Sequence, residues 1–270
     1  MRSEGRRLSV SSDTLQRWGK SSPSEAFLMD TEAALQEIQN RLARAKSVTV
    51  LTGAGISADS GVPTFRGTEG LWKNFRPEEL ASPDAFERDP KLVWEWYNWR
   101  RKLLSTKSPN PGHEALVELE KQVEQFWLIT QNVDGLHAIA GSQKLSEIHG
   151  NIWKVRCTGC GIVEDNRDVP IDILPKCQKC FGLLRPHIVW FGESLNPEDL
   201  EHSYQALRSC EILLIIGTSG VVYPAASFGP VAKDHGAFVA ELNLDPTPNS
   251  EIVDMAIQGK AKDLVPRLLA

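Results

Sequence analysis

The chain has 270 residues, enough for one large domain or two unequal ones. Hydrophobic residues make up 41% and charged residues 24%, the balance of a globular protein with a buried core. The formal net charge of -5 excludes a general polyanion binder, because non-specific nucleic-acid affinity comes from neutralisation of phosphates by lysine and arginine. No apolar run approaches the roughly 20 residues of a membrane-spanning helix, so we expect no membrane and no specific nucleic-acid partner.

Residues 1–29 are rich in serine and arginine and lack hydrophobic periodicity, so we expect a flexible extension ending near a possible second start, Met29. A mitochondrial presequence is the alternative, because such segments are also rich in arginine and serine. Glu4, Asp13 and Glu25 count against it, since presequences avoid acidic residues. A cytoplasmic location is therefore the expectation.

From residue 30 onward the hydrophobic pattern becomes regular. Leu35, Ile38 and Leu42 recur at helical spacing after a possible cap at Asp30 or Thr31. Short apolar runs, each followed by a polar or glycine-containing turn, then alternate with helical patterns. The apolar runs lie at 47–52, 126–130, 212–216 and 238–242, and two helical patterns at 113–125 and 197–208. This alternation predicts an α/β fold with a parallel sheet covered on both faces, whose ligands bind beyond the carboxyl ends of the strands.

A glycine-rich turn, Gly53-Ala54-Gly55-Ile56-Ser57, follows the first predicted strand. Glycines there let the backbone approach a pyrophosphate, and the N–H groups of a following helix suit its oxygens. The third glycine comes later than a strict G-x-G-x-x-G pattern requires, and a tight strand-to-helix turn would need similar glycines. Nucleotide binding and a purely structural turn both remain open from this segment alone.

The loop that follows carries Thr64, Phe65 and Arg66, and then Trp72. Polar, glycine-containing loops with large aromatic residues are able to close over a bound cofactor. The alternative is a surface loop anchored by its two aromatic side chains.

A helical stretch at 94–101 places Tyr97 and Arg100 three residues apart, and therefore on one face of the helix. A guanidinium holds a carboxylate through two charge-assisted hydrogen bonds, and a tyrosine hydroxyl adds a third. From spacing alone, a helix with Trp94 and Trp99 in the core and its arginines in solvent is slightly favoured.

The second core strand ends in a polar turn that contains Gln131, Asn132, Val133 and Asp134. Its amides and carboxylate suit a ribose, a carboxamide or a water molecule, whereas local turns made by the same side chains are the structural alternative. His149 follows shortly afterwards. Histidine titrates near neutrality and so suits general-base chemistry on a hydroxyl, although a lone histidine is more often structural.

Two close cysteine pairs follow, separated by sixteen residues, within the window of four-cysteine zinc sites. They are Cys157, Cys160, Cys177 and Cys180. Four thiolates complete the tetrahedral coordination of zinc and leave no position for a catalytic water, so we expect one structural zinc ion.

The segment after the second cysteine pair alternates two apolar faces, with Ile188 and Trp190 on one and Val189 and Phe191 on the other. One face suits a channel for an alkyl chain, and core packing is the alternative. The fifth cysteine, Cys210, stands beside an apolar run and is expected to be a small buried hydrophobe.

Taken together, these segments resemble the sirtuin family of NAD-dependent protein deacylases. The matching pieces stand in family order over about residues 45–270: GAGISADSGVPTFRG, TQNVDGLH, IHG, the paired cysteines, RPHIVWFGE and GTSGVVYPA. The resemblance implies a large Rossmann-like domain over 30–150 and 185–270. It also implies a small zinc-binding module at 151–184, with residues around 68–110 forming a helical part of the small domain.

The resemblance also implies roles for single residues. His149 looks like the catalytic base on a ribose hydroxyl of NAD, with Asn132 beside it. The expected NAD contacts are Gly53, Ala54, Gly55, Ile56, Ser57, Thr64, Phe65, Arg66, Trp72, Gln131, Asn132, Val133, Asp134, Gly217, Thr218, Ser219, Asn243, Leu244, Asp245 and Ala261. The expected acyl-lysine and peptide contacts are Ala81, Tyr97, Arg100, Val189, Phe191, Gly192 and Glu193.

The reaction implied by the family joins NAD and an acylated lysine of a protein, and releases lysine, nicotinamide and O-acyl-ADP-ribose. The Tyr-x-x-Arg spacing and the small Ala81 match class III sirtuins, which remove succinyl, malonyl and glutaryl groups. We therefore expect desuccinylase and demalonylase activity, with deacetylation in addition. The alternatives are a mono-ADP-ribosyltransferase with the same NAD site and a non-catalytic NAD-sensing or zinc-ribbon adaptor.

Overall fold

The computed structural model describes residues 31–64 and 80–270. The expected N-terminal extension lies outside this range, and so do three expected NAD contacts, Phe65, Arg66 and Trp72. Within the described part of the chain, no helix is both long and apolar enough to cross a membrane.

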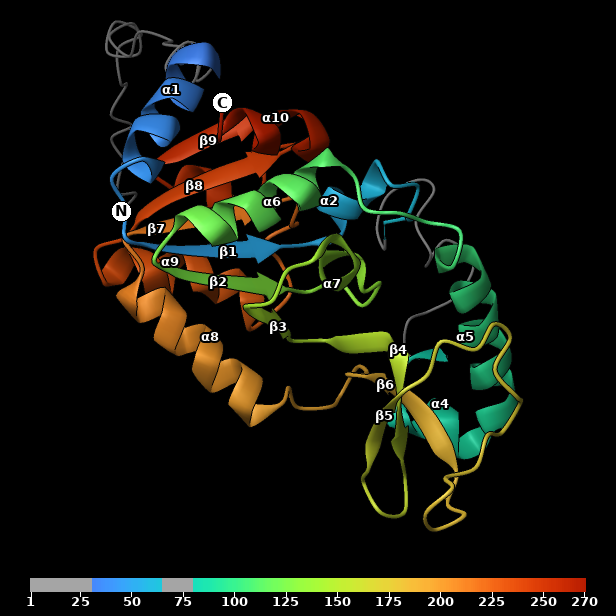
Figure 1. The fold of residues 1–270 in the computed structure, drawn as a ribbon. Coiled ribbons are helices and arrows are strands. Elements are labelled where there is room, and N and C mark those ends of the chain that lie inside the picture. Colours follow the sequence, from blue (N-terminus) through green and yellow to red (C-terminus); the bar gives the residue numbers. More distant parts are fainter. Residues whose placement is uncertain (1–30, 65–79) are drawn as a thin grey trace, which may run out of the picture.

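The larger part of the molecule is a six-stranded parallel sheet (Figure 1) with the strand order β3-β2-β1-β7-β8-β9. The strands are β1 (Ser47–Thr52), β2 (Gln125–Thr130), β3 (Leu145–Glu147), β7 (Ile212–Ile216), β8 (Phe238–Asn243) and β9 (Met255–Gln258). This is the order of a doubly wound nucleotide-binding sheet, whose direction of winding switches between β1 and β7. The expected α/β fold with a Rossmann-like sheet is confirmed.

Helices cover both faces of this sheet (Figure 1), as the alternation of patterns predicts. The first face carries α1 (Thr31–Leu42), α6 (Pro111–Gln122) and α10 (Ala261–Arg267), and the second carries α8 (Pro197–Ser209) and α9 (Phe228–Asp234). Leu35, Ile38 and Leu116 are buried on the first face, and Leu207 and Phe228 on the second. Every residue of β1 and of β7 is buried, which is why both runs are almost purely apolar or β-branched.

Local signals set where the helices begin. Asn110 and Asn196 cap α6 and α8 with their side chains, and a proline stands at the start of each helix. The short helices α2 (Ala54–Ala58) and α7 (Leu136–Ala140) follow β1 and β2, and the turns η2 (Ala225–Ser227) and η3 (Pro248–Glu251) follow β7 and β8. The two edge strands β3 and β9 were not predicted from the sequence.

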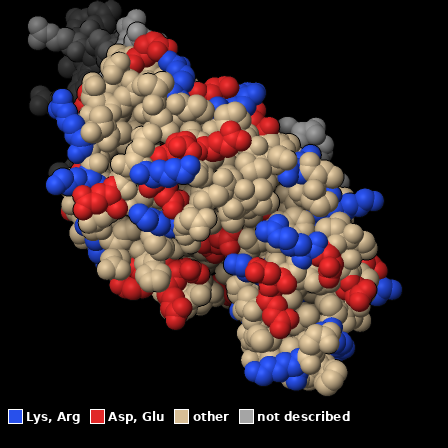
Figure 2. All heavy atoms as spheres, viewed as in Figure 1, with Lys and Arg blue, Asp and Glu red and all other residues tan. Residues whose placement is uncertain are grey.

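A smaller part packs beside the carboxyl end of the sheet (Figure 1). It contains an antiparallel sheet in the order β5-β4-β6 and two helices with their own core. The elements are β4 (Gly150–Cys157), β5 (Val163–Asp165), β6 (Leu184–Ile188), α4 (Pro83–Arg88) and α5 (Pro90–Leu104). The outline of the molecule is indented between the two parts, and acidic and basic side chains are interspersed over both on the face drawn in Figure 2.

The turns after β1 and β7 lie against each other without space for a side chain. Gly55 donates its N–H to the Gly217 carbonyl oxygen at 2.8 Å. A Cβ atom on Gly55 would lie 2.6 Å from Gly217 Cα, and one on Gly217 would lie 2.5 Å from the Ile56 nitrogen. Gly217 also has a φ of +61°, where side chains are strained. The glycines therefore allow the close contact between the two turns, independently of any ligand that the turns bind.

We expect Gly217→Ala to lower the free energy of unfolding by roughly 3 kcal/mol or more, because it adds a steric overlap to the strain of a positive φ. Gly236→Ala is the matched control, since Gly236 has a φ of +90° with nothing within 4 Å of the added Cβ. Its expected loss is only about 1–2 kcal/mol. Urea denaturation measures both values, and equal losses would contradict the interlocking of the two turns.

Candidate active site and metal centre

Polar side chains meet at the carboxyl ends of β1, β2 and β7. The Gln131 side chain donates to Thr218 Oγ1 at 2.8 Å. The Asn132 amide donates to the Gly53 carbonyl oxygen at 3.0 Å and to Ser57 Oγ at 3.2 Å. Residues that the sequence places in three separate turns therefore form one hydrogen-bonded group at the switch point of the sheet, where folds of this class bind ligands.

Asp134 lies under this group, with only 5% of its surface exposed. Its carboxylate accepts a hydrogen bond from the Leu136 N–H at 2.8 Å. Burial raises the pKa of Asp134, while the hydrogen bonds from Leu136 and Ser57 and the charge of Arg100 act in the opposite direction. Val133 beside it is also buried.

His149 lies between β3 and β4, where the chain passes from the large sheet to the small one. Its Nδ1 atom lies 3.0 Å from the Gln131 carbonyl oxygen. A carbonyl only accepts, so Nδ1 carries the proton and Nε2 keeps a lone pair. Burial lowers the pKa of His149, partly offset by this hydrogen bond, so the imidazole is neutral at pH 7 and able to accept a proton.

Two further histidines stand behind the group and were not assigned from the sequence. His113 Nε2 lies 3.4 Å from Ser57 Oγ, and His137 Nε2 lies 2.9 Å from Thr52 Oγ1. Their ring centroids are 4.8 Å apart. Burial lowers the pKa of His113 to about 4, and it lowers that of His137 as well, so both rings are neutral. His113 is part of the capping box at the start of α6, a sequence pattern that by itself indicates only a structural role.

The remaining expected NAD contacts lie around the ends of β1, β7 and β8. Asn243 at the end of β8 donates to the Thr218 carbonyl oxygen at 2.7 Å, which joins two of these turns. Ala261 is buried at the start of α10. Ser219, Leu244 and Asp245 are exposed, Ala54 and Thr64 are half-buried, and Ile56 is buried.

The expected substrate segment runs beside His149. The Val189 N–H donates to the His149 carbonyl oxygen, and the Phe191 N–H donates to the Ala81 carbonyl oxygen, both at 2.9 Å. Ile188 and Trp190 are buried while Phe191 is 49% exposed, which confirms the predicted two faces. Gly192 is exposed at the turn that ends this segment.

The Glu193 carboxylate points back into the protein. It accepts two hydrogen bonds from the Arg185 guanidinium, at 2.6 and 2.8 Å, and one from the Trp190 N–H at 2.8 Å. Arg156 lies 3.6 Å from the same carboxylate. The Glu193 side chain therefore fixes the shape of the substrate segment from inside.

Tyr97 and Arg100 lie side by side on α5 and are both buried, with 1% and 6% of their surfaces exposed. The Tyr97 oxygen accepts a hydrogen bond from Trp190 Nε1 at 2.9 Å. The Arg100 guanidinium lies 5.0 Å from the Trp96 ring centroid and faces a small cavity lined also by Val62. Burial raises the pKa of Tyr97 and lowers that of Arg100. The structure therefore rejects the alternative in which Arg100 extends into solvent.

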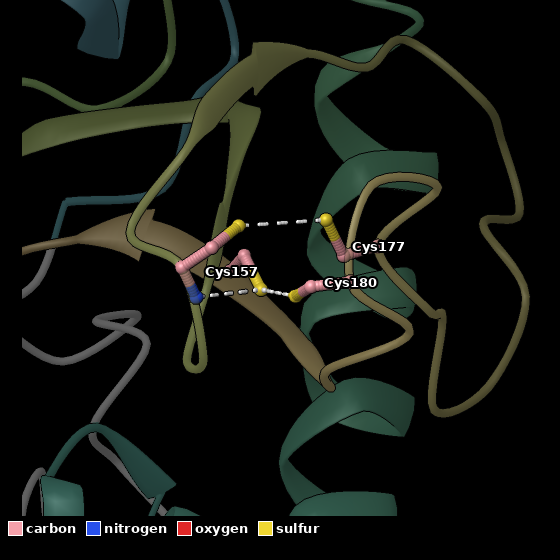
Figure 3. A group of neighbouring side chains, drawn as sticks. Cys157, Cys177 and Cys180 are labelled. Carbon is pink, nitrogen blue, oxygen red and sulfur yellow. Dashed lines mark hydrogen bonds between the residues drawn. The ribbon is translucent and has the colours of Figure 1, made fainter.

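The four paired cysteines converge at the tip of the small sheet (Figure 3), where Cys157 ends β4. Their sulfur atoms all lie within 4.8 Å of one another. Cys157 and Cys180 have sulfurs 3.4 Å apart, and Cys160 and Cys177 have sulfurs 3.8 Å apart. Tetrahedral zinc with Zn–S bonds of about 2.3 Å places its sulfurs about 3.8 Å apart, so the cluster fits one zinc ion with four protein ligands.

Cys210 is buried far from this cluster, beside α8 and β7, as its sequence context predicts. It is not among the residues that form the metal-binding group.

Comparison with known proteins agrees with this geometry. A family model described as the Sir2 family matches residues 53–224. The chain belongs to the Sir2 family. The NAD-dependent protein deacylase of Aquifex aeolicus (strain VF5) is 55% identical over 216 residues, which cover 80% of this chain and 90% of that protein.

Two further comparisons place this sirtuin among deacylases. The mitochondrial NAD-dependent protein deacylase sirtuin-5 of Canis lupus familiaris is 42% identical over 263 residues, covering 87% of this chain and 85% of that protein. A solved Sir2 homolog–NAD complex superposes with a TM-score of 0.82 at 44% identity, and covers 87% of this chain and 92% of that one. This sirtuin is therefore an NAD-dependent protein deacylase, with NAD as co-substrate and four cysteines placed for one zinc ion.

We expect the purified sirtuin to contain one zinc ion per chain, and Cys177→Ser to lose it, because tetrahedral coordination needs all four thiolates. The melting temperature should fall together with the zinc content. Metal analysis by mass spectrometry measures the stoichiometry. Cys210→Ser is the matched control and should keep one zinc ion; loss of zinc from both variants would contradict the assignment.

Proposed function

We propose that this sirtuin removes succinyl and malonyl groups, with acetyl groups in addition, from lysine side chains of proteins. Nicotinamide and O-acyl-ADP-ribose are the other products. The observation that carries the proposal is the buried pair of Tyr97 and Arg100, of which Tyr97 packs in the same core as Ile188 and Trp190 of the substrate segment.

NAD supplies an ADP-ribosyl group: the acyl oxygen of the substrate lysine displaces nicotinamide from C1′ of the ribose. The neighbouring ribose hydroxyl then takes up the acyl group, and a water molecule completes the release of lysine. On the protein side, the turns after β1, β7 and β8 hold the dinucleotide. Gln131, Asn132, Ser57 and Asp134 stand at its nicotinamide and ribose end, where amide and hydroxyl donors are already oriented by one another. Such preorganisation lowers the cost of holding two reactants in one geometry.

His149 is the proposed general base. Its Nε2 lone pair is available because the Gln131 carbonyl oxygen fixes the proton on Nδ1. The backbone of His149 pairs with Val189 of the substrate segment, so the imidazole and the channel for the acyl-lysine are held at a fixed distance. A ribose hydroxyl placed between them transfers its proton to Nε2 as it attacks the acyl group.

The pH dependence of kcat/KM tests this role. The pKa of His149 is lowered, so the neutral base is present above the ordinary histidine pKa and is lost only as the pH falls below it. We expect an acidic limb with an apparent pKa below 6.5, the ordinary histidine value. His149→Ala should abolish turnover while NAD binding persists; an acidic limb above neutrality would contradict the assignment.

The acyl specificity rests on charge and space. Arg100 is a buried guanidinium, and a buried cation binds a carboxylate far more strongly than an exposed one does. The Ala81 carbonyl oxygen accepts a hydrogen bond from the Phe191 N–H, so Ala81 lies next to the substrate segment. Its methyl side chain takes up little space beside the proposed channel. A dicarboxylic acyl group carries a carboxylate that can pair with Arg100, whereas an acetyl group does not.

Arg100→Met tests this specificity, since methionine keeps an unbranched apolar stem but lacks the charged guanidinium. We expect kcat/KM for a succinyl-lysine peptide to fall roughly 10- to 100-fold, the worth of a hydrogen-bonded charge, with a smaller change for the acetyl-lysine peptide. Arg208→Met is the control, because Arg208 packs on Tyr204 of α8, an arginine–tyrosine pair outside the site. Equal losses on both peptides would refute the carboxylate clamp.

A further inference from the structure

The buried indole N–H of Trp190 has a residue of the expected acyl pocket as its hydrogen-bond partner. Trp190 follows β6 in the substrate segment and is only 2% exposed. Its indole N–H donates to the Tyr97 oxygen at 2.9 Å, a contact between residues 93 positions apart. Phenylalanine would fill most of the same space, so the position of this N–H is the feature that calls for an explanation.

Two side chains pack against the indole ring of Trp190. The Arg185 guanidinium lies 3.4 Å from its ring centroid, and the Phe86 ring packs against it at 5.2 Å. Arg185 is itself held by the two hydrogen bonds to Glu193 and by a third to the Ile188 carbonyl oxygen at 3.0 Å. The direction of the indole N–H is therefore fixed by packing and by a buried ion pair.

This arrangement decides what the Tyr97 hydroxyl does. The indole N–H is a donor only, and it donates to the Tyr97 oxygen, while the Arg100 guanidinium lies 5.9 Å from the Tyr97 ring centroid. The bond from Trp190 uses the oxygen of Tyr97 as acceptor, so it does not use the hydroxyl proton. That proton is available for an acceptor on the same side of α5 as Arg100.

We propose that Trp190 is a positioning residue for acyl selectivity, which turns the proton of the Tyr97 hydroxyl toward the carboxylate of a succinyl or malonyl group. The inference rests on the proposed function and adds to it a residue that orients one of the two proposed contacts to the acyl carboxylate. Arg100 supplies the charge, Tyr97 supplies a neutral donor, and Trp190 sets the direction of that donor. If Trp190 were only core packing, loss of its N–H would change stability without changing the choice of acyl group.

Trp190→Phe removes the donor and keeps most of the ring. We expect the ratio of kcat/KM for succinyl-lysine over acetyl-lysine peptide to fall roughly 5- to 10-fold, the worth of one oriented hydrogen bond, through a higher KM for the succinyl peptide. Trp94→Phe is the matched control. Trp94 is fully buried in the same core and donates its N–H at 3.0 Å to the Leu184 carbonyl oxygen, so this variant loses an equivalent bond and should keep the wild-type ratio.

A double-mutant cycle tests whether Trp190 acts through Tyr97. In a Tyr97→Phe background, Trp190→Phe should cause no further fall in the ratio. Phe86→Leu loosens the packing of the indole ring without removing its N–H, so it should also lower the succinyl-to-acetyl ratio. This variant replaces Trp190→Phe in the test if Trp190→Phe does not fold. The inference is overturned if Trp190→Phe or Phe86→Leu keeps the wild-type ratio. It is also overturned if Trp190→Phe lowers the ratio as much in the Tyr97→Phe background as in the wild type.

The wild type and Arg100→Met separate the two proposals. If the wild type prefers the succinyl peptide and Arg100→Met removes that preference, the proposed function stands, and the Trp190 variants then decide the further inference by themselves. If the wild type shows no such preference, the proposed acyl specificity fails first and the role of Trp190 fails with it.

Discussion

The turn after β1 and the turn after β7 lie against each other at Gly53, Gly55 and Gly217, where neither turn has space for a further side chain. This contact brings the carboxyl ends of two strands that are far apart in the sequence into one place. Gln131 reaches Thr218 and Asn132 reaches Gly53 only because β2 and β7 flank β1 in register. A side chain larger than hydrogen at these glycines would separate the turns and the polar groups they carry.

Behind this contact the protein buries several ionisable groups, and burial is the largest cause of the shifts in their pKa values. His113 and His137 stay neutral because burial disfavours their cations. Asp134 is buried as well, and it is stabilised by donors and by the charge of Arg100. An interior of this kind strengthens every charge interaction made within it, which suits a site that brings a dinucleotide and an acyl-lysine together without bulk water.

The cysteine cluster and α5, the helix that carries Tyr97 and Arg100, belong to the same small part of the molecule. Arg101 of α5 donates to the Ile152 carbonyl oxygen of β4 at 3.0 Å, and Asn98 donates to the Ile171 carbonyl oxygen at 2.8 Å. The same helix carries Tyr97 and Arg100 on its neighbouring face. The metal-binding cysteines therefore belong to the part of the molecule that supports α5, because α5 cannot shift without disturbing its hydrogen bond to β4.

The sequence by itself determined the four central strands of the large sheet, several of the helices around them and the four paired cysteines, because hydrophobic periodicity and close cysteine spacing are local properties of the chain. It did not predict the edge strands β3 and β9, which have only three and four residues and so are too short to show a clear period. The sequence assigned no role to His113, and it placed Trp190 on one of two apolar faces. Only the tertiary structure decided that the first lies behind Ser57 and the second donates to Tyr97. Contacts between residues tens of positions apart in the sequence depend on how the sheets and helices pack. No local sequence pattern specifies which of these residues meet in space.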